Sequence, residues 1–202
     1  MQRFDKKQHL NTRRDLKNQP GEREGGSKSE MQDLIEACKR SERPAQRRLY
    51  DFLSPKMFPL CLRYMGNRDS AEDILQEGFV TLFTKLDSFS GEGSFEGWAR
   101  KIFVNTALMS LRRTDALKLS EDLETAWGVS SENESAVQTM GYKELMGLIS
   151  QLPAGFRTVF NMYVIEGYSH KEIAGMLGIS EATSRSQLQR ARMMLQKRIK
   201  RS

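Results

Sequence analysis

Hydrogen-bonding and basic side chains gather in one short segment near the C-terminus of the chain. Amides, hydroxyls and guanidinium groups match the donor and acceptor patterns that base edges present in the major groove of DNA. From Glu181 to Ser202 there are seven Arg or Lys residues against one Glu, which suits contact with phosphates. The sequence therefore predicts a surface that reads duplex DNA, and the alternative is an ordinary helical hairpin with a solvated basic face. The side chains of this surface are Arg185, Ser186, Gln187, Gln189 and Arg190.

A helix, a tight turn and a second helix are predicted to position this surface. Ser169, followed three residues later by Glu172, forms a capping box that begins the first helix. Gly178 can adopt the positive φ that ends it, and Ser180 can cap the second helix. This second helix is expected to bury Leu188, Ala191, Met194 or Leu195, and Ile199. The pattern is typical of a helix-turn-helix, in which the second helix enters the major groove.

A second group of side chains follows Ser94, which is expected to cap a helix that reaches Arg113. Its core stripe is predicted to be Ala99, Ile102, Phe103, Thr106 and Met109. A different face carries an aromatic ring, two cations and an amide, which can stack on unpaired bases and bond to their edges. The alternative is a Trp packed at a helix end beside solvated neighbours. The residues of this face are Trp98, Lys101, Asn105 and Arg112.

An acidic helix precedes this one and spans roughly Ser70 to Leu86. Four acidic residues lie between positions 69 and 77 without a single Lys or Arg. One face, opposite the apolar stripe, carries Asp73, Gln76, Glu77 and Val80 at i, i+3, i+4 and i+7. In a chain of net charge +6, a compact acidic face favours a positively charged protein partner. The alternative is a solvated helix N-terminus, where the dipole favours acids.

The apolar periodicity is helical wherever it is strong, so the chain is expected to be all-α, with two small helical domains. Residues 1–30 are predicted to be a disordered basic extension. Residues 31–113 form the first domain, in which Pro55 and Pro59 are expected to punctuate the helices. Residues 114–137, with six acidic residues and one Lys, are predicted to be a flexible acidic linker, and residues 138–202 form the second domain.

Composition argues against several classes of protein. The only two cysteines, Cys38 and Cys61, stand in apolar helical patterns and are expected to be buried thiols, with no zinc site or disulfide. No phosphate-binding glycine loop and no His/Cys cluster occurs, so neither a metal, a cofactor nor an enzymatic activity is expected. No apolar segment is long enough to span a bilayer and no signal peptide is seen, which predicts a cytoplasmic protein without membrane insertion.

Three segments together resemble one family. In order and spacing they are similar to extracytoplasmic-function (ECF) sigma factors of the sigma-70 family, and the resemblance extends from Met31 to about Arg198. The segments are DSAEDILQEGFVTLFTKLDSF, GSFEGWARKIFVNTALMSLRR and LPAGFRTVFNMYVIEGYSHKEIAGMLGISEATSRSQLQRAR. The sequence of these segments also resembles members of this family from Bacteroidetes-type bacteria. The resemblance implies a sigma factor that binds core RNA polymerase, through the β′ clamp helices and the β flap, and promoter DNA. It also allows an anti-sigma factor as a further partner, whose presence the sequence alone leaves open.

The resemblance also assigns residues. It implies that Asp73, Gln76, Glu77 and Val80 bind polymerase. It implies that one loop and one face of the following helix contact the melted −10 element. The loop residues are Phe89, Ser90, Gly91, Glu92, Gly93 and Ser94, and the helix residues are Trp98, Lys101, Asn105 and Arg112. It also implies that the −35 element is contacted by Ser169, Arg185, Ser186, Gln187, Gln189 and Arg190. Ser90 departs from the basic residue that many relatives carry before the loop glycine, and Gln189 stands at a variable specificity position.

Two rival functions come from other classes. A helix-turn-helix transcription regulator that is not a polymerase subunit would need a sensing N-terminal half, such as an alternating βα receiver, and residues 31–113 show no strand alternation. A nucleic-acid enzyme such as a recombinase would need a nucleophile with acid–base or metal support, and no such constellation is seen.

Overall fold

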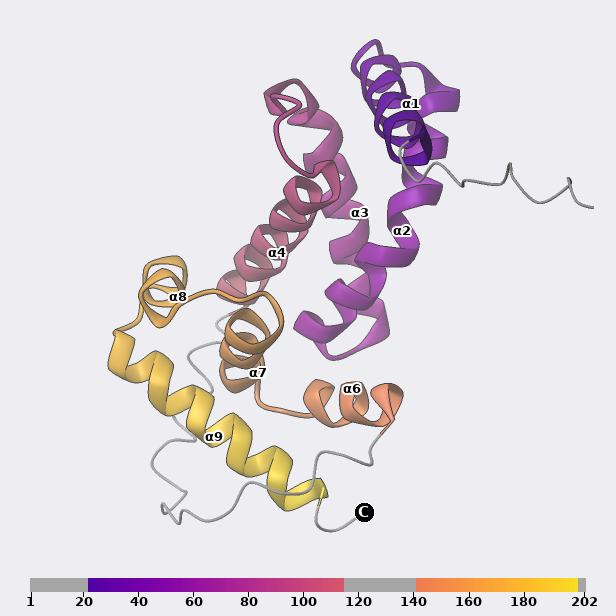
Figure 1. Cartoon of the computed structure of the whole chain (residues 1–202). Coiled ribbons are helices and arrows are strands. Elements are labelled where there is room, and N and C mark those ends of the chain that lie inside the picture. Colours follow the sequence, from indigo (N-terminus) through magenta and orange to yellow (C-terminus); the bar gives the residue numbers. More distant parts are fainter. Residues whose placement is uncertain (1–21, 115–140, 200–202) are drawn as a thin grey trace, which may run out of the picture.

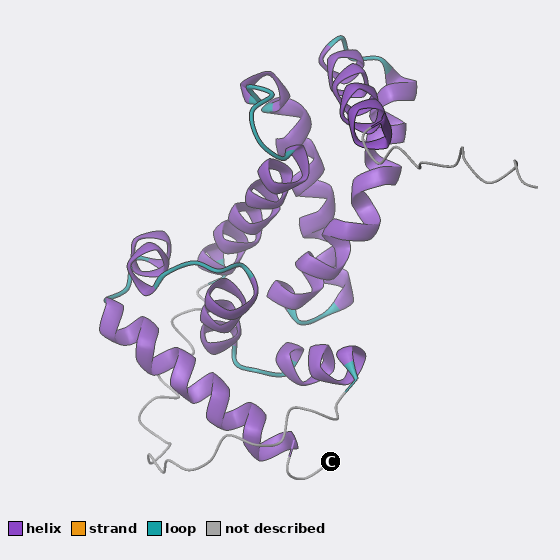
Figure 2. Cartoon of the chain, in the orientation of Figure 1, coloured by secondary structure: helices purple, strands orange, loops and turns teal. Residues whose placement is uncertain are grey.

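The computed structural model describes residues 22–114 and 141–199, and every regular element in these two ranges is a helix (Figures 1 and 2). The all-α class is thereby confirmed for the described part of the chain. The basic segment up to residue 21 and the acidic segment 115–137 lie outside it. We call residues 22–114 the first unit and residues 141–199 the second unit.

The first unit contains five helical elements, and the second unit contains five more. Those of the first are α1 (Glu22–Lys39), α2 (Arg43–Met65), α3 (Arg68–Thr84), the 3-10 helix η1 (Leu86–Ser88) and α4 (Phe95–Arg113). Those of the second are α6 (Tyr142–Ser150), α7 (Ala154–Phe160), the π-helical segment η4 (Asn161–Ile165), α8 (His170–Leu177) and α9 (Glu181–Ile199). Helix α1 begins inside the segment 1–30 that the sequence predicts to be disordered.

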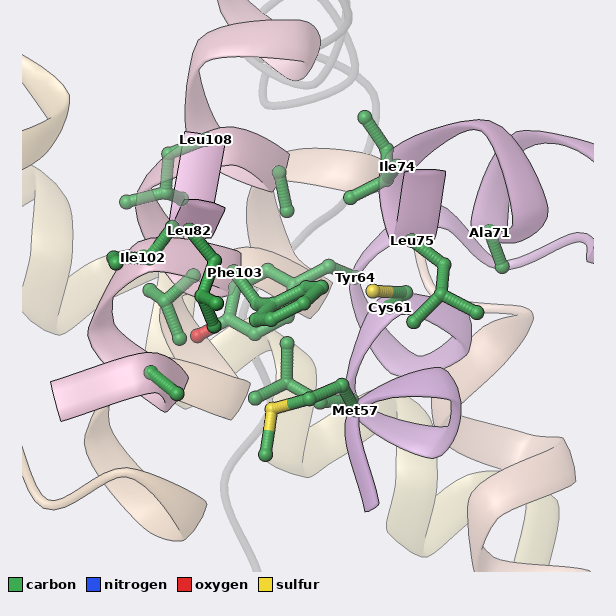
Figure 3. Close-up of a cluster of buried hydrophobic side chains, with 14 of the residues drawn as sticks. Met57, Cys61, Tyr64, Ala71, Ile74, Leu75, Leu82, Ile102, Phe103 and Leu108 are labelled. Carbon is green, nitrogen blue, oxygen red and sulfur yellow. The ribbon is translucent and has the colours of Figure 1, made fainter. Parts of the chain in front are cut away.

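The core of the first unit lies where α2, α3 and α4 meet (Figure 3). Phe103 of α4 is fully buried, and it stands against Gly78 of α3 so closely that a Cβ atom at residue 78 would lie 2.4 Å from the ring. Helices approach this closely only where one of them carries no side chain. The buried side chains labelled in Figure 3 are Met57, Cys61, Tyr64, Ala71, Ile74, Leu75, Leu82, Ile102, Phe103 and Leu108.

Two details of the first unit differ from the sequence prediction. Pro55 and Pro59 do not divide the chain, because α2 runs continuously from Arg43 to Met65 with both prolines inside it. Met109 was expected in the core stripe of α4 but is 61% exposed. Phe52 of α2, although apolar, is 40% exposed, with the ammonium of Lys56 lying 4.1 Å from its ring centroid.

The second unit contains the predicted helix-turn-helix. The hydroxyl of Ser169 accepts a hydrogen bond from the backbone N–H of Glu172, and the Glu172 carboxylate accepts one from the Ser169 N–H, at 3.3 and 2.8 Å. Gly178 ends α8 with φ of 71°, and Ser180 accepts a bond from the Thr183 N–H at 2.9 Å. These local signals fix where α8 begins and ends and where α9 begins.

The two units touch. Contacts join α2 to both α6 and α7, and Figure 1 shows the second unit against the lower end of α2. The sequence predicts two domains joined by a linker and gives no sign of this contact.

Candidate polymerase and nucleic-acid interfaces

The acidic face of α3 points away from the core. Asp73 and Gln76 are exposed, and Val80 is 67% exposed although it is apolar. Glu77 is half-buried and its carboxylate lies 3.0 Å from the guanidinium of Arg113 on α4. The face therefore combines an exposed carboxylate, an amide and an apolar side chain, which is a combination that protein partners bind more readily than nucleic acid does.

The loop between η1 and α4 is built by two glycines and a cap. Gly91 and Gly93 have φ of 81° and 75°, which residues with side chains rarely adopt. The hydroxyl of Ser94 accepts the N–H of Gly97 and begins α4, while Ser90 accepts the N–H of Glu92. The loop is thus held open to solvent by its own hydrogen bonds.

Phe89 corrects one expectation at this loop. It was expected to contact the −10 element, but it is only 7% exposed. Its ring packs edge-on against Phe95, with the centroids 5.1 Å apart, because both rings cover the apolar N-terminal end of α4. Phe89 therefore supports the loop from beneath.

Trp98 belongs to the same aromatic cluster and remains partly exposed. Its ring centroid lies 5.4 Å from that of Phe89 and 5.6 Å from that of Phe95. Lys101, Asn105 and Arg112 are exposed on α4, so the four predicted residues lie on the solvent side of the helix. An indole held in place on two further rings can stack on a base at little additional cost in conformational entropy.

The outward face of α9 is smaller than expected. Arg185 and Gln189 are exposed, and Ser186 and Arg190 are half-buried. The guanidinium of Arg185 lies 2.7 Å from the Glu181 carboxylate, a surface pair that screens readily in salt.

Gln187 corrects the sequence prediction for α9. It was placed on the base-reading surface but is 3% exposed. It lies three residues from Ser184 and four from Ala191, both fully buried, so helical periodicity turns it toward the core.

The beginning of α8 is ordered by the predicted capping box and by His170, which the sequence analysis did not single out. Ser169 is exposed, but its N–H and hydroxyl both donate to Glu172, which lowers the pKa of that carboxyl. The ring of His170 stacks on Tyr163 at a centroid distance of 4.4 Å, and its Nδ1 lies 2.9 Å from the Ser184 hydroxyl. Burial, with Arg185 nearby, lowers the pKa of His170.

Polar residues at the contact between the units were missed by the sequence analysis. Glu166, between η4 and α8, places its carboxylate against two guanidinium groups of the first unit, Arg63 and Arg100. Arg157 and Asn161 donate to the C-terminal carbonyls of α2. The one available signal was the presence of Arg157 and Asn161 inside an otherwise apolar helical pattern, which predicts burial but not the partner.

In the described ranges, no three His, Cys, Asp or Glu residues stand close enough to hold a metal ion. None of the described helices is both long and apolar enough to cross a membrane.

Two family models match the chain. Residues 49–116 match the family described as sigma-70 region 2, and residues 142–195 match sigma-70, region 4. The chain is 31% identical over 144 residues to ECF RNA polymerase sigma factor SigE of Mycolicibacterium smegmatis, covering 69% of this chain and 56% of that one. It is 29% identical over 177 residues to the RNA polymerase sigma-H factor of Pseudomonas aeruginosa, covering 82% and 92%.

Among solved structures, one match is the sigma factor RpoE in complex with the anti-sigma factor NepR from Bartonella quintana. It is 20% identical, with a TM-score of 0.48, and the match covers 76% of this chain and 96% of that one. The two family matches and the curated relatives place the chain among the ECF sigma factors of the sigma-70 family.

Proposed function

We propose that three outward faces of this sigma factor divide the work of promoter recognition. The face of α3 (Asp73, Gln76, Glu77 and Val80) binds the β′ clamp helices of core RNA polymerase. The loop 90–94 and the outer face of α4 (Trp98, Lys101, Asn105 and Arg112) hold the melted −10 element. The second unit binds the β flap and reads the −35 element through α9, with Arg185, Ser186, Gln189 and Arg190, and through Ser169 at the start of α8.

The observation that carries the proposal is the separation of opposite chemistries on adjacent helices. On α3 the outward groups are acidic and apolar, with Asp73 and Gln76 exposed, whereas α4 presents a Trp, two cations and an amide. A polyanionic strand is repelled by the first face and attracted by the second. One rigid helix pair can therefore hold a protein partner on one side and a nucleic-acid strand on the other.

The same arrangement accounts for promoter opening without covalent chemistry. Extruding a base from the duplex costs a few kcal/mol. Stacking of one base on an aromatic side chain returns about 1–3 kcal/mol, and contacts of the second unit with the duplex add to this. Because the chain acts together with polymerase on chromosomal promoters, the cytoplasmic location predicted from the sequence belongs to this proposal. An anti-sigma factor remains a prediction from the family resemblance.

The test is binding of core RNA polymerase to Asp73→Arg. Asp73 makes no hydrogen bond or ion pair among the described residues, so the change leaves the internal contacts of the unit intact. A reversed charge facing a basic partner costs several kcal/mol, and we expect core binding to be lost. The matched control is Asp51→Arg on α2, an exposed Asp whose pair with Arg47 contributes little to stability.

Binding is measured by fluorescence anisotropy of the labelled sigma factor titrated with core enzyme. Loss in Asp73→Arg with wild-type affinity in Asp51→Arg supports the assignment. Wild-type affinity in Asp73→Arg would remove the α3 face from the polymerase interface.

A further inference from the structure

One side chain of α1 lies at the loop between η1 and α4. Helix α1 packs against η1, and in Figure 1 it lies at the same end of the first unit as the start of α4. The carboxamide oxygen of Gln32 is 3.8 Å from the point where a Cβ atom would stand on Gly91. No atom of the described residues lies within 4 Å of the corresponding point on Gly93. Gln32 therefore borders the loop on one side, at a residue whose backbone no side chain covers.

The orientation of the Gln32 amide is set by its neighbours on α1. The amide nitrogen donates to a carboxylate oxygen of Glu36 at 3.2 Å, and the ammonium of Lys39 donates to the same oxygen at 3.0 Å. An ionised carboxylate accepts hydrogen bonds and donates none, so the amide cannot turn its oxygen toward Glu36. The Oε1 atom of Gln32 consequently faces the loop, where no described group donates to it.

The side chains of the loop itself leave this oxygen uncovered. The hydroxyl of Ser90 accepts the backbone N–H of Glu92 at 3.3 Å, so it is engaged within the loop. The side chain of Glu92 is exposed and makes no hydrogen bond to Gln32, and Phe89 is buried. A base that enters beside Gly91 therefore meets a hydrogen-bond acceptor that belongs to α1.

An acceptor at this place distinguishes two classes of base. Adenine and cytosine carry an exocyclic amino group at C6 or C4, whereas guanine and thymine carry a carbonyl oxygen there. The amino group can donate to Oε1, but the carbonyl oxygen would face Oε1 with no proton between them. One hydrogen bond of this kind corresponds to roughly a two- to tenfold difference in affinity.

We propose that Gln32 is a specificity-determining residue for the −10 element, through which the loop 90–94 prefers an extruded adenine or cytosine to guanine or thymine. The proposal deepens the proposed function and rests on the assignment of this loop to the melted −10 strand. Glu36 is a positioning residue, because it fixes which end of the Gln32 amide the base meets. Helix α1 thereby becomes a third element of the −10 site, beside the loop and α4.

The test is Gln32→Met in the full chain bound to core RNA polymerase. Methionine is unbranched like glutamine, and its thioether is only a weak acceptor. Holoenzyme captures short single-stranded DNA from a pool of random sequence, and the captured strands are sequenced. Wild type should favour adenine and cytosine at one position by roughly two- to tenfold, and Gln32→Met should bring that ratio close to one. Glu36→Gln should also lower the ratio, because its amide can donate to Gln32 and so lets the Gln32 nitrogen turn toward the loop.

The matched control is Gln46→Met near the start of α2, which should keep the wild-type ratio, and circular dichroism verifies folding of every variant. Trp98→Ala separates this inference from the proposed function, since loss of stacking should weaken capture of all strands alike. No preference in wild type, or an unchanged ratio in Gln32→Met, overturns the inference alone if Trp98→Ala still weakens capture. Unchanged capture by Trp98→Ala would show that the strand is not held on this face, and both proposals would then fail.

Discussion

Gly66 and Arg157 approach each other so closely that a Cβ atom on Gly66 would lie 2.6 Å from Nη1 of Arg157 and 2.9 Å from the carbonyl oxygen of Ser150. Gly66 also ends α2 with φ of 79°. One glycine therefore terminates a helix of the first unit and makes room for the side chain with which the second unit caps it.

Gly66→Ala is predicted to destabilise the chain more than Gly178→Ala. Both positions have a positive φ, which costs a residue with a side chain roughly 1–2 kcal/mol. Only Gly66 adds a collision, because nothing lies within 4 Å of a Cβ atom at Gly178. Urea unfolding of the two variants measures the difference, and equal losses of unfolding free energy would mean that Arg157 does not dock at Gly66 in solution.

Cys61 is predicted to be unreactive in the folded protein. Burial raises the pKa of its thiol to about 12, and burial also raises that of Cys38. At pH 8 a thiol with that pKa is ionised in only about one molecule in ten thousand, and the thiolate is the species that reacts. Alkylation by iodoacetamide, followed by mass spectrometry, should be slow in buffer and fast in denaturant. Equal rates would contradict the burial of both cysteines.

The capping box of α8 is predicted to lose its charge-dependent stability in acid. Hydrogen bonds from the backbone N–H and hydroxyl of Ser169 lower the pKa of Glu172 below its ordinary value. A lowered pKa gives a contribution that is present above the ordinary value, near 4.5, and disappears as the pH falls through the lowered one. The difference in unfolding free energy between wild type and Glu172→Gln should therefore shrink below pH 4.5. A difference independent of pH would show that the charge plays no part.

Two glutamines of α9 are predicted to behave differently, although they are two residues apart. Gln189 is exposed, so Gln189→Ala should relax the preference at one −35 position by about 1–3 kcal/mol. Gln187 is 3% exposed, so Gln187→Ala should lower the unfolding free energy and leave base preference unchanged. Affinities of holoenzyme for single-base −35 variants check the first, and thermal unfolding checks the second. A relaxed base preference in Gln187→Ala would contradict the observed rotation of the helix.

The helix-turn-helix could be predicted from residues that are close together in the sequence. The capping box of Ser169 and Glu172, the turn at Gly178 and the cap at Ser180 each involve residues within four positions, and the structure has all three. The outward position of Asp73 and Gln76 also follows from helical periodicity within one element.

The contact between the units could not be predicted from local sequence. Glu166 meets Arg63 across 103 positions and Arg100 across 66. No periodicity relates residues so far apart, and an Arg in a helical pattern reads equally well as a surface charge. The position of Gln187 was missed for a different reason: it lies on the same stripe of α9 as Ser184 and Ala191, both buried, but as a polar residue it was assigned to the outward face.

The contact of Gly78 with Phe103 has a consequence for promoter geometry. The proposed polymerase-binding face is on α3 and the proposed strand-binding face is on α4, so under this proposal the separation of these two helices sets how far the single strand lies from the clamp. At Gly78 that separation is fixed by the absence of a side chain, since even a methyl group would lie 2.4 Å from the Phe103 ring. A substitution there would leave both surfaces chemically intact and still move the melted strand relative to the catalytic centre of polymerase.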